Sequence, residues 1–249
     1  MTGSPQLPTI DLSLFDIGDP WRDHVAAQID WAAGTYGAFR LVGHSVDGGL
    51  IDNLLELGGK YVKRGVAGPD LPGFHDSVRE YATSLTGLGH KLMSAMARGL
   101  RLNDGFFADH YTGNPRTSLR IGDYPVALST GGQPDTHEAG KRRLLTLVTL
   151  GDSHGLQVKL DDCWVDVPAL PGALLCSVGP VLERLTQRRF RHAPLRLSRS
   201  VESERPSLCF VFEPGMGAVL TPPATLWPRA ADSRQLLPES VALRSPSSR

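Results

Sequence analysis

The feature that most constrains the fold is a succession of short apolar runs in the second half of the chain. The runs are rich in Leu, Val and Ile and are separated by turn residues. They are Ser118–Leu128, Arg143–Leu150, Gly155–Leu160, Cys163–Val167 and Gly172–Val178. Short runs with turn signals between them predict β-strands, and many such strands in succession predict a sandwich, jelly roll or barrel.

The segment His192–Pro214, "HAPLRLSRSVESERPSLCFVFEP", predicts two further strands joined by a polar turn. Arg205 and Ser207 lie two residues apart on the second of these strands, so both side chains should point to the same face. A guanidinium fork beside a hydroxyl suits a carboxylate. We therefore expect a carboxylate clamp at Arg205 and Ser207.

The first half of the chain has helical periodicity. Apolar residues from Val78 to Leu100 form one stripe, which predicts a long helix packed on a core, with Met93 and Met96 as core residues. The other predicted elements are a strand at Leu7–Ser13, a helix at Pro20–Ala33, a strand within Tyr36–Val46 followed by a helix from Asp47, a loop at Gly65–Gly73, and short helices at Phe106–Tyr111 and Val181–Leu185.

Composition excludes several function classes. Lys+Arg and Asp+Glu both number 26, so no charge excess favours a nucleic acid or a membrane as partner. The three cysteines form no CxxC pair, which favours buried thiols in a reducing compartment. The N-terminus lacks the pattern of a signal peptide, and no apolar run reaches transmembrane length. We therefore expect a cytoplasmic protein.

Five segments, in order, resemble the isopenicillin N synthase-like family of iron(II)/2-oxoglutarate-dependent dioxygenases. They are "LPTIDLS", "GAFRLVGHSV", "LRIGDYP", the stretch from "LLTLVTL" to "LLCSVG", and "RPSLCFVFEP". The resemblance implies a mainly β fold with flanking α-helices, a double-stranded β-helix (jelly roll) with N-terminal helices packed outside. It implies one domain at 1–222, divided into an N-terminal strand and helical part at 1–116 and a jelly-roll core at 117–222. Residues 223–249 would be a partly disordered extension.

The metal site departs from the family pattern, in which an HxD pair and a distant His hold iron(II). An ungapped count back from "LTLV" puts Ala139 and Lys141 at the HxD positions, and "PLRL" puts Leu195 at the distal His. We therefore expect a lost triad and no cofactor. Iron(II) and 2-oxoglutarate are expected only under an alternative, a different metal site around His137. Further candidate ligands for that site flank the same predicted strand: Glu138, Asp152 and His154.

The resemblance also implies roles for the pocket residues. Arg205 and Ser207 would hold the carboxylate of 2-oxoglutarate or of a substrate, and Tyr124 would add a hydroxyl contact. If Lys141 points inward, it supplies an electrophile or general acid, with His137 as proton-transfer partner. The alternatives are a solvated charge run at Lys141–Arg143 and a vestigial clamp.

Three hypotheses about function, from different functional classes, agree with these observations. The first is a small-molecule enzyme of specialised metabolism that performs a metal-independent, non-oxidative step such as cyclisation, isomerisation, elimination or a pericyclic reaction. The second is an oxidoreductase with the unorthodox metal site around His137. The third is a non-catalytic partner of an active, paralogous dioxygenase. The expected ligand is a small molecule carrying a carboxylate, with no nucleic acid or membrane partner.

Overall fold

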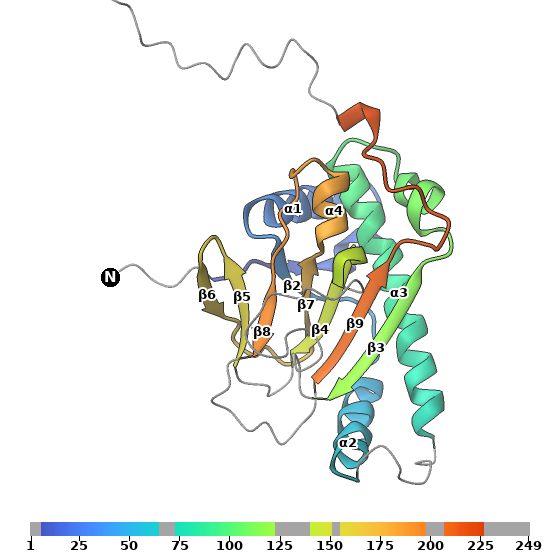
Figure 1. The fold of residues 1–249 in the computed structure, drawn as a ribbon, viewed down its shortest axis with the longest axis vertical. Helices are drawn as coiled ribbons and strands as arrows, with labels where there is room; N and C mark the ends of the chain where they lie inside the picture. The colour runs from blue at the N-terminus through green and yellow to red at the C-terminus, as the bar shows by residue number, and fades with distance from the viewer. Residues whose placement is uncertain (1–5, 65–72, 123–139, 151–154, 198–206, 227–249) are drawn as a thin grey trace, which may run out of the picture.

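The structure, a computed structural model, describes residues 6–64, 73–122, 140–150, 155–197 and 207–226. Two β-sheets form the body of the protein, and helices α1 (Trp21–Thr35) and α3 (Phe74–Gly99) pack against the larger sheet (Figure 1). The expected mainly β fold with flanking helices is confirmed.

The larger sheet has the strand order β1-β2-β7-β4-β9-β3, and the smaller has the order β6-β5-β8. The strands of the larger sheet are β1 Thr9–Asp11, β2 Ala38–Val42, β7 Ala173–Val178, β4 Leu145–Leu150, β9 Ser207–Glu213 and β3 Arg116–Gly122. The strands of the smaller sheet are β6 Cys163–Asp166, β5 Leu156–Leu160 and β8 Leu195–Leu197. Every pairing among these strands is antiparallel except that of β1 with β2.

The helices fall mainly where the apolar periodicity predicts them. The α-helices are α1 Trp21–Thr35, α2 Gly48–Arg64, α3 Phe74–Gly99 and α4 Pro180–Leu185. Short helical turns are η1 Leu12–Asp16, η2 Ala108–Thr112, η3 Gly140–Arg142 and η4 Ala224–Leu226. No helix in these described ranges is long and apolar enough to cross a membrane.

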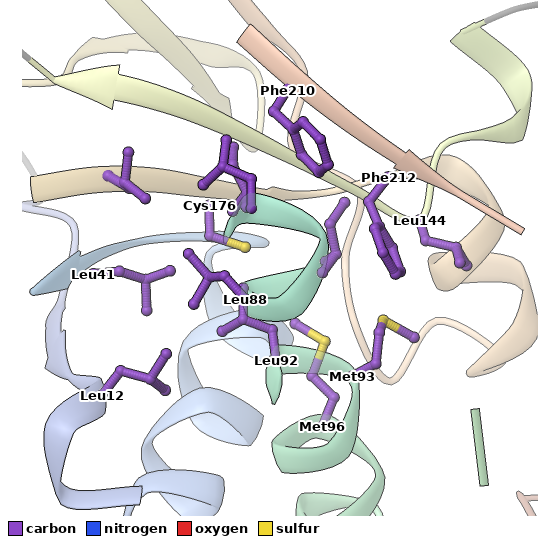
Figure 2. Packing of buried hydrophobic residues seen from close by; sticks show 14 of the residues in the cluster. Leu12, Leu41, Leu88, Leu92, Met93, Met96, Leu144, Cys176, Phe210 and Phe212 are labelled. Atoms are coloured by element: carbon purple, nitrogen blue, oxygen red, sulfur yellow. The ribbon is translucent and has the colours of Figure 1, made fainter. Parts of the chain in front are cut away.

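The apolar stripe of α3 packs against the larger sheet, as its spacing predicts. Figure 2 shows Leu88 and Leu92 of α3 in the same cluster as Cys176 of β7 and Phe210 and Phe212 of β9. Met93 and Met96 are also buried in this cluster, at 1% and 0% exposure, so their assignment to the core is confirmed.

A second apolar cluster fills the space between the two sheets. Its members include Val148 of β4, Val158 of β5 and Leu175 of β7. Strand β9 contributes to both clusters, because alternate side chains on a strand point to opposite faces. Cys209 and Val211 join the cluster between the sheets, whereas Leu208, Phe210 and Phe212 join the cluster under α3.

The two strands predicted within His192–Pro214 do not form a hairpin. Strand β8 pairs with β5 in the smaller sheet, and β9 pairs with β3 and β4 in the larger one. The residues that join them, 198–206, lie outside the described ranges. Both predicted strands are present, but they do not pair with each other, because each buries its apolar face against a partner distant in sequence.

The first predicted strand is shorter than expected. Strand β1 ends at Asp11, whose carboxylate Oδ1 accepts hydrogen bonds from the Ser13 backbone N–H at 3.0 Å and from the Ser13 hydroxyl at 2.7 Å. This capping starts η1, so the chain turns before Ser13.

The end of α3 is joined to the start of α1 by ion pairs. Arg98 pairs with Asp19, with Asp23 at 2.6 Å and with Asp104 at 3.0 Å. These carboxylates, Asp104 first, raise the pKa of the Arg98 guanidinium. The pairs add to the apolar contacts that α1 and α3 make within the cluster under the larger sheet.

Several expectations concern residues outside the described ranges. They include most of the loop Gly65–Gly73, the part of the predicted strand beyond Gly122, and residues 227–249 of the C-terminal extension. The division into a domain at 1–222 and an extension at 223–249 stays a prediction.

Candidate functional site

Ser207 begins β9 and faces the space between the two sheets. It is 7% exposed and shares a strand face with Cys209 and Val211, both of which belong to the cluster there. Its partner across the ladder is Gly122, the last residue of β3. The structure therefore places the hydroxyl of the predicted clamp at one end of the jelly-roll interior.

The other residues predicted for this pocket lie just outside the described ranges. Arg205 precedes Ser207 by two residues, and Tyr124 follows Gly122 by two. His137 and Ala139 also fall outside. The structure thus brings the strand ends that flank Arg205 and Tyr124 next to each other, and the roles of both side chains stay predictions.

Leu195 occupies the position where the family resemblance places a metal-binding histidine. It lies in β8 opposite Val158 and is partly buried against the cluster between the sheets. An isobutyl side chain offers no lone pair to a metal. At this position the residue present does not fit iron, and a ligand set would have to come from other side chains.

His192 does not replace the histidine missing at Leu195. Its Nδ1–H donates to the carbonyl of Val178 at 2.8 Å, and its backbone N–H donates to Glu183 Oε1 at 3.1 Å. The side chain lines a pocket with Thr35 and Tyr36, at the end of α1.

The cationic run Lys141–Arg143 separates into exposed and buried members. Lys141, in η3, is exposed, which agrees with the alternative of a solvated charge run, and its role as electrophile or general acid stays a prediction. Arg143 is 8% exposed and is the buried cation of the run, which the sequence did not single out. Leu145, two residues after Arg143, pairs with Phe212 of β9. Phe212 lies five positions along β9 from Ser207, and at the ordinary rise of a strand this separates the two residues by about 17 Å.

One buried polar contact was missed because its tyrosine belongs to an apolar stripe. The Tyr81 hydroxyl of α3 lies 2.9 Å from the Thr149 hydroxyl of β4, and Tyr81 is fully buried. Burial raises the pKa of Tyr81 to about 12, a shift that the Thr149 hydrogen bond partly offsets. Tyr81 therefore stays protonated and joins α3 to the sheet.

Within the ranges that the structure describes, no three His, Cys, Asp or Glu side chains gather as a metal site would require. The four residues named for an unorthodox site, His137, Glu138, Asp152 and His154, all lie outside those ranges. Of the expected ligand positions, Lys141 and Leu195 are described residues, and Leu195 alone packs against the cluster between the sheets.

Two family models match the chain. Residues 7–63 match the N-terminal domain described as "non-haem dioxygenase in morphine synthesis N-terminal", and residues 106–214 match the 2OG-Fe(II) oxygenase superfamily. Together the two matches cover more than half of the chain.

Curated relatives agree with these matches. An iron/ascorbate oxidoreductase of Dictyostelium discoideum, named as probable, is 31% identical over 169 residues, which are 61% of this chain and 46% of the relative. The 1-aminocyclopropane-1-carboxylate oxidase of Prunus mume is 27% identical over 181 residues, 70% of this chain and 56% of the relative. The chain spans about half the length of these relatives.

Solved structures with the same fold cover nearly all of the chain. A full-length protein of Neurospora crassa, crystallised in complex with alpha-KG, has a TM-score of 0.74 at 15% identity, covering 93% of this chain and 92% of that one. JOX2 in complex with 2OG, Fe and JA has a TM-score of 0.75 at 22% identity, covering 90% and 80%. These likenesses confirm the double-stranded β-helix.

The expectation that no cofactor is used is contradicted by these comparisons. The matching family is named for 2-oxoglutarate and iron(II), and the JOX2 structure contains both. That expectation rests on Ala139, Lys141 and Leu195, and of these Leu195 alone is a described residue packed between the sheets.

The comparisons bear on the family name as well. They name the 2OG-Fe(II) oxygenase superfamily and an N-terminal dioxygenase domain, a broader group than the isopenicillin N synthase-like label. Residues 106–214 therefore match the 2OG-Fe(II) oxygenase superfamily, residues 7–63 match the N-terminal dioxygenase domain, and the chain has the double-stranded β-helix fold of its structural neighbours.

Proposed function

We propose that this protein is a small-molecule oxidoreductase that uses iron(II) and 2-oxoglutarate and holds iron without a ligand from β8. The observation that carries the proposal is the superfamily match over residues 106–214, within which Ser207 lies at the start of β9 in the jelly-roll interior. The free thiols at Cys163 and Cys176 support placing this activity in the reducing cytoplasm.

In this proposal the chain's own residues bind and orient a carboxylate. The Ser207 hydroxyl donates a hydrogen bond to it, and Arg205 adds a bidentate charge-assisted contact. The aliphatic cluster of β4, β5, β7 and β9 excludes water behind the clamp. Iron(II), when bound, supplies the centre for reaction of dioxygen with 2-oxoglutarate.

Iron would be held by residues next to β4 in sequence, and Leu195 contributes no ligand. His137 precedes β4, and Asp152 and His154 follow it. Imidazole and carboxylate groups are the ligands that iron(II) takes in this class of enzyme. This assignment rests on residue type and sequence position.

Anaerobic iron(II) titration of the purified protein tests the metal assignment. We expect one iron per chain in the wild type and loss of that iron in His137→Ala. His24→Ala, an exposed histidine on α1, serves as the matched control and should keep the wild-type stoichiometry. Failure of the wild-type protein to bind iron(II) would contradict the proposal.

Binding of 2-oxoglutarate tests the clamp separately. Ser207→Ala should weaken binding about ten- to a hundredfold, because a hydrogen bond to a charged group contributes about 1.5–3 kcal/mol. Ser118→Ala, an exposed serine on β3, is the control and should bind as the wild type does. Equal affinities for wild type and Ser207→Ala would remove the clamp from the proposal.

A second candidate is a reaction on the same scaffold that does not oxidise its substrate, such as cyclisation, isomerisation or elimination. The observation in its favour is Leu195, an aliphatic residue at the expected ligand position. The two candidates differ in oxygen demand. Turnover coupled to consumption of dioxygen and 2-oxoglutarate supports the oxidoreductase, and turnover without it supports the second candidate.

A further inference from the structure

A pocket of about 400 Å³ lies at the end of the jelly roll opposite Ser207. It is bounded by the end of α1, the end of β5, helix α4 and residues 191–194. Strand β5 begins at Leu156, which pairs with Leu197, and runs toward Leu160. Lys159 is therefore near the far end of β5, where its backbone contacts Pro194. The volume lies within the range of small-molecule sites, roughly 300–1,000 Å³.

The backbone holds the two sides of this pocket in fixed positions. The Lys159 N–H donates to the Pro194 carbonyl at 2.8 Å, and the His192 N–H donates to Glu183 Oε1 at 3.1 Å. Arg191 donates to the Thr35 carbonyl at 3.0 Å and also pairs with Asp161. The charges of Arg191 and Asp161 therefore neutralise each other.

Two charges of opposite sign remain without an ionic partner in the described part of the chain. Lys159 is half-buried, and its ammonium makes no hydrogen bond or ion pair within the described ranges. Glu183 is half-buried too, and its side chain there contacts the neutral N–H of His192. No ion pair joins Lys159 to Glu183 among the described residues, although both line the same pocket. Half-buried charges gain from a partner that supplies the opposite charge.

The remaining wall offers apolar and aromatic surface. Leu160, Pro194 and the ring of Tyr36 line it, and Tyr36 is held edge-on by Trp31 with ring centroids 5.5 Å apart. A ligand that pairs with Lys159, pairs with Glu183 and packs on this apolar wall carries a carboxylate, an ammonium and an apolar side chain.

We propose that this pocket binds a free α-amino acid, with its carboxylate on Lys159, its ammonium on Glu183 and its apolar side chain toward Tyr36 and Leu160. The site is separate from the carboxylate clamp at Ser207, and it does not depend on iron or 2-oxoglutarate. It adds a second small-molecule site to the fold.

Titration of the protein with each of the common L-amino acids, monitored by calorimetry or ligand-observed NMR, tests the site. We expect saturable binding of at least one apolar amino acid at millimolar concentration. Its N-acetyl derivative, which lacks the ammonium, and its amide, which lacks the carboxylate, should each bind at least about tenfold more weakly. Absence of binding by the whole panel, or equal binding of a capped derivative, overturns the proposal.

Two variants and two controls assign the charges. Lys159→Gln and Glu183→Gln should each weaken binding at least about tenfold, and the glutamine oxygen can still accept the His192 N–H. Lys60→Gln, exposed on α2, and Ser207→Ala should bind as the wild type does. Unchanged binding in Lys159→Gln or Glu183→Gln overturns the proposal. Loss of binding in Ser207→Ala would instead place the amino acid in the jelly-roll interior, and this also overturns it.

Discussion

His44 follows β2 in the "GHSV" turn and is held in one neutral tautomer. Its Nδ1 accepts the Val46 N–H at 3.2 Å, so Nε2 carries the proton and donates to the Gly172 carbonyl at 2.9 Å. The side chain is 8% exposed, and burial lowers the pKa of His44 from 6.5, more than the Gly172 hydrogen bond raises it. Protonation would cost the Val46 contact and charge a buried ring.

The stability of the fold should therefore fall on the acid side. Below pH 6.5 the unfolded chain protonates His44 before the folded chain does, so the free energy of unfolding decreases as pH falls from 6.5 through the lowered folded pKa. Denaturant midpoints measured at several pH values should show this slope, and His44→Gln should flatten it. His24→Gln, exposed on α1, should keep the wild-type slope.

Also at the residue scale, the cationic run Lys141–Arg143 contains one exposed member and one buried member. Lys141 is exposed whereas Arg143 is 8% exposed, and the Arg143 carbonyl accepts the Val181 N–H at 3.1 Å. Charge counting treats the two residues alike. Lys141 lies within η3, whereas Arg143 lies after the end of η3 and two residues before the start of β4.

At the scale of elements, α3 determines how closely a helix approaches the larger sheet. Gly87 and Gly89 lie two residues apart in this helix, yet their surroundings differ. A Cβ added to Gly87 meets nothing within 4 Å, whereas one added to Gly89 would lie 2.7 Å from the ring of Phe212. Phe212 is fully buried, so its ring cannot move into solvent.

This contrast gives a matched pair of substitutions. Gly87→Ala should raise the free energy of unfolding by about 0.5–1 kcal/mol, because alanine loses less backbone entropy in a helix. Gly89→Ala should lower it by about 1–3 kcal/mol, because the helix must move from β9. Chemical denaturation measures both changes. Equal effects of the two substitutions would mean that Gly89 does not set the distance between α3 and β9.

At the scale of the whole molecule, the three cysteines report on the integrity of the core. Cys163, at the start of β6, is exposed, whereas Cys176 and Cys209 are buried at 0% and 1% exposure. Burial also raises the pKa of the Cys176 thiol, which disfavours its reactive thiolate form. Cys176 packs under α3 and Cys209 between the sheets, so together they monitor both apolar clusters.

A thiol reagent should therefore modify one cysteine rapidly in the native protein and all three in denaturant. Cys163→Ser should remove the rapid phase and leave the two slow ones. The slow phases should accelerate together with global unfolding as denaturant is added. Rapid modification of Cys209 in the native protein would show that the space between the sheets is open to solvent.

Local pattern alone predicted much of the fold and part of the site. The apolar run "SLCFVFE" predicted a strand, and the stripe of α3 predicted a core helix with Met93 and Met96 inside. Both signals are local, because the geometry of a strand or helix fixes which side chains share a face. Ser207 could be placed on an inward face from the same alternation.

Tertiary structure alone decided which partners the elements take. It put β8 and β9 in different sheets, exposed Lys141 and buried Arg143, and paired Tyr81 of α3 with Thr149 of β4. It also gathered Lys159 and Glu183 around one pocket, although they are far apart in sequence. Local periodicity determines which face of an element is apolar. The competition among all apolar faces for burial determines what that face meets.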